Sequence, residues 1–165
     1  MRTFFILSFV ANLALTLISL DILPYCVAVH FGPGAVPNGW GSKYVSALFF
    51  LVIQTVLFFS MYYSSRMIFT FPARWMNLPN KDYWLKDENK PRAGEIISKL
   101  MWQFGTALFL FLFIVNLLTI QANLSRPVRL DERAFIIALV MFFIFIGYWL
   151  ISFVRSFRVP GEKVA

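Results

Sequence analysis

The sequence is poor in charged residues and has a single cysteine and a single histidine. Only 14% of the 165 residues are charged, whereas 59% are hydrophobic and 20 of them are Phe. A soluble domain carries about 25% charged residues to cover its surface, so this composition excludes an ordinary soluble domain. The mean hydropathy of +0.71 also indicates lipid as the solvent. We therefore predict an integral membrane protein.

The scarcity of metal ligands and nucleophiles argues against an enzyme. Cys26 is the only cysteine, which excludes an intramolecular disulfide. Cys26 and His30 are four residues apart, but two ligands do not complete a zinc site, so we predict no metal and no cofactor. A hydrolase needs a nucleophile, a base and oxyanion donors in contact, and the neighbours Ser42 and Lys43 are poorly placed to align. We predict that the protein has no enzymatic activity.

The net charge of +7 does not indicate nucleic-acid binding. The Lys and Arg residues stand at the ends of apolar runs and do not form one stripe with interleaved aromatics. Their placement is that of the positive-inside rule for membrane proteins. We therefore expect no nucleic-acid partner and use the basic residues to assign topology.

Four long apolar runs predict four transmembrane helices. Every backbone amide in lipid must be paired within its segment, so the runs are helices and not strands. At 1.5 Å per residue each run reaches across a hydrocarbon core of about 30 Å. The first run is long for a signal peptide and lacks a small-residue cleavage site, and the second stops at Pro72. The expected spans of this single membrane domain, residues 1–165, are 3–24, 44–71, 96–120 and 134–154.

The distribution of Lys and Arg gives the orientation. With the N-terminus inside, eleven of the fifteen lie on the cytoplasmic side and four lie outside, namely Lys43, Arg126, Arg129 and Arg133. The predicted fold is all-α, an up-down-up-down four-helix bundle with both termini in the cytoplasm. Outer loops are expected at 25–43 and 121–133. A cytoplasmic loop at 72–95 is expected to lie in the headgroup layer, anchored by Trp75, Tyr83 and Trp84.

Polar residues inside the predicted spans form a candidate seam. Ser8, Asn12 and Thr16 share one face of the first span, and the second and third spans offer hydrogen-bonding partners in Gln54 and Asn116. The seam either holds the helices together or lines a path for a small polar or ionic substrate. Transport pathways commonly need an ionisable residue within a span, and none is present, so adhesion between helices is the favoured interpretation.

The stretch from His30 to Lys43 is the part of the chain whose composition lipid does not explain. Strand-forming residues precede it, and two clusters of Gly, Pro and Asn within it are typical of turns. We predict an ordered outer loop, with a short β-hairpin as its simplest form, and Asp21 placed to pair with His30 or Lys43. The candidate residues for binding a ligand or partner are His30, Gly34, Asn38, Trp40 and Lys43.

The same loop carries a family resemblance. Its motifs resemble the signature loop of a large family of small bacterial membrane proteins of unknown function: Leu23-Pro24, Val29-His30-Phe31, Gly34, Pro37-Asn38-Gly39-Trp40 and Ser42-Lys43. That domain also occurs in the immunity protein that protects a sporulating bacterium from its own sporulation-delaying toxin. The run from Asn77 to Trp84 is similar to a segment after the second helix in many members. The resemblance covers roughly the first half of the chain, and the additional spans of the immunity protein are missing here.

The resemblance implies a multi-pass protein of the bacterial inner membrane whose first outer loop is functional. The leading hypothesis is a non-enzymatic binding protein, of the immunity or sensor type, that recognises an extracytoplasmic peptide, lipid headgroup or protein through this loop. The alternative is an auxiliary structural subunit of a larger transporter or membrane complex, with the polar seam as its interface. Both hypotheses allow a homo- or hetero-oligomer in the lipid bilayer.

Overall fold

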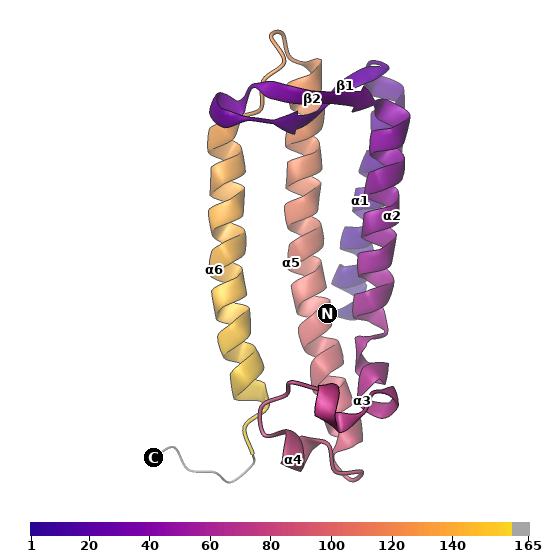
Figure 1. Ribbon diagram of the computed structural model, residues 1–165, viewed down its shortest axis with the longest axis vertical. Coiled ribbons are helices and arrows are strands. Elements are labelled where there is room, and N and C mark those ends of the chain that lie inside the picture. Colours follow the sequence, from indigo (N-terminus) through magenta and orange to yellow (C-terminus); the bar gives the residue numbers. More distant parts are fainter. Residues whose placement is uncertain (160–165) are drawn as a thin grey trace.

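Four long helices dominate the computed structural model, which describes residues 1–159 (Figure 1). They are α1 (Arg2–Ile22), α2 (Lys43–Tyr62), α5 (Lys90–Leu124) and α6 (Glu132–Ser156). Each is long and apolar enough to cross a membrane, with a mean hydropathy of 2.0 to 2.7 in its most apolar window. The prediction of four helices long and apolar enough to span a membrane is confirmed. Residues 160–165, which include Lys163 from the topology count, lie outside the described residues.

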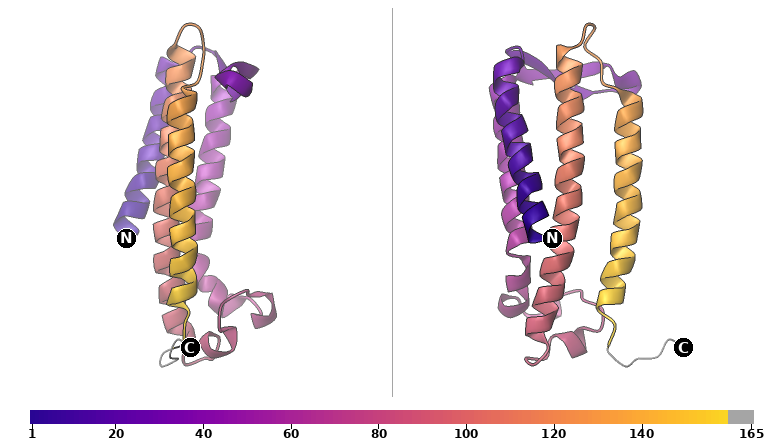
Figure 2. Two further views of the ribbon diagram at one scale, coloured as in Figure 1. Left: turned by 90° about the vertical axis from the view of Figure 1, so that its left-hand side faces the viewer. Right: turned by 180° about the vertical axis from the view of Figure 1, so that it is seen from behind.

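The four helices run in alternating directions but do not close into a four-helix bundle. Helices α1, α2 and α5 pack against one another, whereas α6 packs mainly along α5 (Figure 2). Ala138 is the only buried residue of α6. A helix that is apolar all round needs no protein partner on most of its faces when lipid surrounds it. The chain is thus a three-helix bundle with a fourth helix beside α5.

A glycine allows α5 to approach α1 and α2 closely. A Cβ atom added at Gly105 would lie 2.4 Å from the ring of Phe5 and 2.9 Å from the sulfur of Met61. The Phe5 ring stacks on Phe58 at a centroid distance of 5.0 Å and meets Phe109 at 5.7 Å. This tightly packed aromatic cluster fixes the relative positions of the three helices.

The expected span 44–71 is not one continuous helix. The regular helix α2 ends at Tyr62, and a 3-10 turn η2 (Ser64–Arg66) and a short helix α3 (Met67–Thr70) follow it. The hydroxyl of Ser64 donates a hydrogen bond to the carbonyl of Met61 at 2.8 Å. Such local bonds from Ser compete with the helical ladder, and 3-10 turns are common where helices end.

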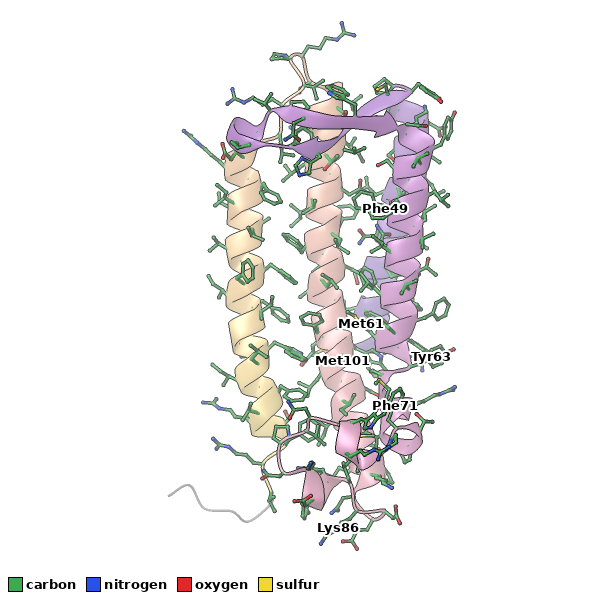
Figure 3. All side chains as sticks on the ribbon, viewed as in Figure 1. Phe49, Met61, Tyr63, Phe71, Lys86 and Met101 are labelled. Atoms are coloured by element: carbon green, nitrogen blue, oxygen red, sulfur yellow. The ribbon has the colours of Figure 1, made fainter. Side chains whose placement is uncertain are left out.

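The connection between α2 and α5 folds into a small core at the end of the molecule opposite the hairpin (Figure 3). It contains a 3-10 turn η3 (Ala73–Trp75) and a short helix α4 (Lys81–Trp84). Trp84 is only 2% exposed. Its indole N–H and the Nδ2 of Asn80 both donate to the carbonyl of Phe157, at 2.9 and 3.0 Å. This core ties the end of α6 to the connection.

Trp84 therefore corrects one prediction. It packs inside the protein and does not anchor the connection in the headgroup layer, because its indole N–H finds a carbonyl partner at the end of α6. Trp75 is 69% exposed and is free to contact lipid headgroups. Elsewhere in the connection, a hydrogen bond from Lys90 and its positive charge lower the pKa of the exposed Asp87.

A conservative substitution tests the role of Trp84. Trp84→Phe keeps an aromatic ring but leaves the Phe157 carbonyl with one donor fewer, so we expect a loss of about 1–2 kcal/mol in the free energy of unfolding. Thermal unfolding of the purified protein in detergent measures this loss. The matched control is Trp75→Phe, whose side chain is exposed and should leave the unfolding temperature unchanged. Equal effects of the two variants would contradict the burial of Trp84.

Candidate functional site

A β-hairpin lies across one end of the helices (Figure 1). Strand β1 (Cys26–Phe31) pairs antiparallel with β2 (Pro37–Ser42), and a 3-10 turn η1 (Pro33–Ala35) joins them. Gly34 has a φ of +72°, a left-handed conformation that glycine adopts without steric cost. The hairpin predicted from the turn residues is confirmed.

The hairpin brings two of the candidate residues into contact. Ala28 pairs with Trp40 and His30 pairs with Gly39, with a β-bulge between these pairs. The bulge places His30 Nδ1 in a hydrogen bond with Asn38 Oδ1. A Cβ atom at Gly39 would lie 3.0 Å from the Cβ of His30, so glycine makes room for the histidine. His30 and Asn38 thus form one exposed polar pair.

Lys43 anchors the base of the hairpin. Its ammonium group donates to the carbonyls of Leu20 and Leu23, at 2.6 and 2.9 Å. Leu20 lies in the last turn of α1 and Leu23 is the C-cap residue, where unpaired acceptors and the helix dipole favour a cation. The expected pairing of Asp21 with Lys43 or His30 is wrong, because Lys43 binds these carbonyls and His30 binds Asn38. Lys43 is therefore a structural anchor between α1 and α2.

Asn123 holds the middle of the hairpin and was missed by sequence reasoning. Its Oδ1 accepts from the backbone N–H of Ala28 at 2.7 Å, and its Nδ2 donates to the carbonyl of Ala28 at 3.1 Å. The side chain is 7% exposed. The only signal in the sequence was an amide placed just beyond the expected end of the third span. Because α5 continues to Leu124, Asn123 lies on the helix and its amide reaches the hairpin.

The connection between α5 and α6 holds the tip of the hairpin. The Nε of Arg129 donates to the carbonyl of Gly34 at 3.2 Å. The backbone N–H of Leu130 donates to the carbonyl of Ala35 at 3.1 Å. The hairpin is consequently hydrogen-bonded to the helical scaffold at its base, its middle and its tip.

Several apolar side chains remain exposed on this fixed hairpin. Trp40 is 53% exposed and Tyr25, just before β1, is 70% exposed. Val29 and Val36 are also about half exposed, at 49% and 54%. Together with the His30–Asn38 pair they give the hairpin both apolar and hydrogen-bonding groups. We call the exposed side chains of Tyr25, Val29, His30, Val36, Asn38 and Trp40 the hairpin surface.

Most of the candidate polar seam lies buried between α1 and α5. Asn12 has no exposed surface, and its Nδ2 donates to the carbonyl of Phe109 at 2.7 Å. Asn116 Nδ2 donates to the hydroxyl of Thr16 at 3.2 Å. Ser8 bonds within its own helix. These side chains face the interior of the chain, so they do not offer an interface to another subunit.

Gln54 lies apart from these hydrogen bonds. It is buried on α2 with no exposed surface, and neither atom of its amide has a partner among the described residues. The Oδ1 of Asn12 is also unpaired in the described part of the chain. Gln54 is therefore a buried polar group that the structure does not connect with the other four seam residues.

A small cavity lies below the hairpin, between α1, α2 and α5. Its volume is about 20 Å³, and Ala28, Lys43, Thr16, Asn116 and Asn123 contribute to its wall. A cavity needs about 10–15 Å³ of such volume to hold one water molecule. The site has the size and polarity for a single bridging water and is too small for a continuous substrate path.

One family model matches the chain. It is described as a domain of unknown function, DUF1648, and it covers residues 7–55. The match includes most of α1, the whole hairpin and the first part of α2. All five candidate binding residues fall within it, and Asn123 and Arg129 fall outside it. No curated protein and no solved structure matches the chain.

Proposed function

We propose that the protein is a non-enzymatic binding protein of the bacterial inner membrane that recognises an extracytoplasmic peptide or protein through its hairpin surface. Toxin immunity and envelope-stress sensing are roles of this class. The observation that carries the proposal is the combination of a hairpin hydrogen-bonded to the scaffold at three places with exposed aromatic and polar side chains.

The fixed backbone favours recognition because a preorganised loop loses little conformational entropy when a partner binds. Trp and Tyr are the residues most enriched among those that dominate binding energy. Trp40 and Tyr25 provide such side chains on the hairpin surface. The His30–Asn38 pair adds hydrogen-bonding groups that can orient a partner.

The basic residues support an outward-facing hairpin. Most Lys and Arg residues, including Arg66 and Arg74, lie in the connection from α2 to α5, at the start of α5 or at the end of α6. These segments form the end of the molecule opposite the hairpin (Figure 1). The positive-inside rule assigns that end to the cytoplasm. The hairpin then faces the extracytoplasmic side, where secreted peptides and envelope proteins are found.

Labelling of the single cysteine tests this orientation. Cys26 is exposed at the start of β1, so a membrane-impermeant maleimide should label it in intact spheroplasts as completely as after lysis. The matched control is Cys26→Ser combined with Ser156→Cys at the other end of the chain, which should react only after lysis. Labelling of Cys26 only after lysis would place the hairpin in the cytoplasm and contradict the proposal.

A double substitution tests the binding role. His30→Ala/Trp40→Ala removes two exposed side chains and leaves Lys43, Asn123 and Arg129, which hold the hairpin, unchanged. The unfolding temperature should therefore stay unchanged. Exposed aromatic residues at interfaces often contribute about 2 kcal/mol or more to the free energy of binding. We therefore expect the yield of polypeptides captured by an impermeant cross-linker at the cell surface to fall at least tenfold. Quantitative mass spectrometry of the purified adducts measures this. Capture of the same polypeptides at the same yield would contradict the proposal.

Lys43→Ala provides the contrasting control. This substitution removes the donor to Leu20 and Leu23, so it should lower the unfolding temperature even where no partner is present. The two variants separate recognition by the hairpin surface from support of the hairpin. If lipid vesicles that contain no other protein stabilised the wild type but not His30→Ala/Trp40→Ala, lipid headgroups would be the ligand and the choice of a polypeptide would be overturned.

A further inference from the structure

The hydrogen bonds of Ala28 determine which edge of the hairpin is open. Both its N–H and its C=O bond to the side chain of Asn123, so both point away from β2. Opposite residues in an antiparallel pair alternate between those that bond to each other and those that do not. Ala28 faces Trp40, so the N–H and C=O of Trp40 also point away from the partner strand, toward the outer edge of β2.

A second contact agrees with this alternation. The N–H of Lys43 donates to the carbonyl of Tyr25 at 2.9 Å, so these two residues form a bonded pair. Tyr25 and Ala28 are three residues apart, and an odd separation changes the type of pair. The Ala28–Trp40 pair must therefore be of the non-bonded type.

The outer edge of β2 is open at Trp40, although Pro37 and a β-bulge interrupt the same strand toward the tip of the hairpin. Exposed edges are normally blunted by Lys, by Pro or by a covering loop. Trp40 stands between Gly39 and Gly41, which have no side chains to shield the backbone. Within residues 1–159, no turn, loop or side chain bonds to the outward N–H and C=O of Trp40. Asn123 provides such cover on the β1 edge only.

The direction of the hairpin makes this edge complementary to itself. The strands lie across the long axis of the helices and hence along the membrane plane (Figures 1 and 2). Two copies with the same orientation in a membrane are related by a two-fold axis along the membrane normal. That rotation reverses an in-plane strand, so two β2 edges meet antiparallel. Trp40 of each copy then supplies one donor and one acceptor to Trp40 of the other.

We propose that the protein forms a homodimer in which the β2 strands of two copies pair through Trp40 and create a four-stranded sheet. The pairing uses backbone groups. It brings the two Trp40 side chains next to each other, while the other side chains of the hairpin surface stay exposed. It goes beyond the proposed binding function and does not depend on it. Since Lys43 lies three residues from the axis, the first turns of the two α2 helices would be about 20 Å apart.

Substitutions at the edge test the dimer. Trp40→Pro removes the indole and the outward backbone N–H, whereas Trp40→Ala removes the indole alone. A lone hairpin does not use this N–H, and proline is tolerated at such edge positions. We expect a dimeric wild type, a dimeric Trp40→Ala and a monomeric Trp40→Pro, by mass measurement in mild detergent and in nanodiscs. Gly41→Pro is the contrasting control. The Gly41 N–H points inward to β1, so its removal should unfold the hairpin. A monomeric wild type, or a Trp40→Pro variant that stays dimeric, would overturn the proposal.

Cross-linking in the membrane gives an independent test. In a Cys26→Ser background, Trp40→Cys places two Cα atoms about 5.5 Å apart across the axis, within disulfide range. We expect rapid oxidation of this variant to a covalent dimer. Phe143→Cys on the exposed face of α6 is the matched control and should remain monomeric. Oxidation of Val52→Cys on α2 without oxidation of Trp40→Cys would indicate pairing through α2 and would overturn the strand pairing.

Discussion

Gly105→Leu is expected to abolish the native packing of α1, α2 and α5. Even a Cβ atom at this position would lie 2.4 Å from Phe5 and 2.9 Å from Met61, far inside contact distance. Overpacking a filled core costs about 1–3 kcal/mol, and a leucine at such a close approach lies at or above the upper end of that range. We expect little folded protein after extraction, measured by size-exclusion chromatography and thermal unfolding.

A glycine in open space provides the control. A Cβ atom at Gly147 on α6 would meet nothing within 4 Å. Gly147→Leu should therefore leave the yield and the unfolding temperature equal to or slightly above those of the wild type, because leucine is the better helix former. Equal behaviour of the two leucine variants would show that α5 does not approach α1 and α2 at Gly105.

Asn123→Leu is expected to release the hairpin while the helices stay folded. The substitution leaves the N–H and C=O of Ala28 without partners, and each unsatisfied buried backbone group costs about 1–3 kcal/mol. We expect hydrogen exchange in residues 26–42 to accelerate by at least a hundredfold, with exchange in α1 and α5 unchanged. Mass spectrometry of the protein in nanodiscs measures both.

Two further substitutions grade this effect. Asn123→Asp keeps an acceptor for the Ala28 N–H but loses the donor to its carbonyl, so the acceleration should be intermediate. Gln121→Leu lies on the same turn of α5 with an exposed side chain and should have no effect on the hairpin. A hairpin that exchanges equally slowly in all three variants would show that Asn123 does not hold it.

The elements that lipid and turn chemistry dictate were predictable from the sequence. Backbone groups in a bilayer must be paired locally, so uncharged runs of about 20 residues specify helices. The turn residues around Gly34 likewise specified a hairpin. The end of α2 was not predictable, because the apolar residues beyond Tyr62 resemble a continued span and the break depends on local bonds of Ser64.

Contacts between distant segments were not predictable. The sequence cannot distinguish a tryptophan that reaches headgroups from one whose N–H meets a carbonyl 73 residues away, as Trp84 does. Asn123 and Ala28 are 95 residues apart, and nothing local to either residue indicates their two hydrogen bonds. The sequence placed Lys43 at the end of the loop, whereas it is the first residue of α2, and its partners depend on where α1 ends. The hairpin that carries the candidate site was therefore predictable from the sequence, and its support was visible only in three dimensions.

The central claim is that the hairpin is a fixed surface and not a mobile loop. Hydrogen exchange of the backbone amides of Val27, Ala28 and Gly41 in the wild-type protein, reconstituted in nanodiscs, tests it most directly. The hydrogen bonds to Asn123 and between the strands predict protection comparable to that of α1. Exchange at the rate of an unstructured peptide, with α1 still protected, would contradict the claim.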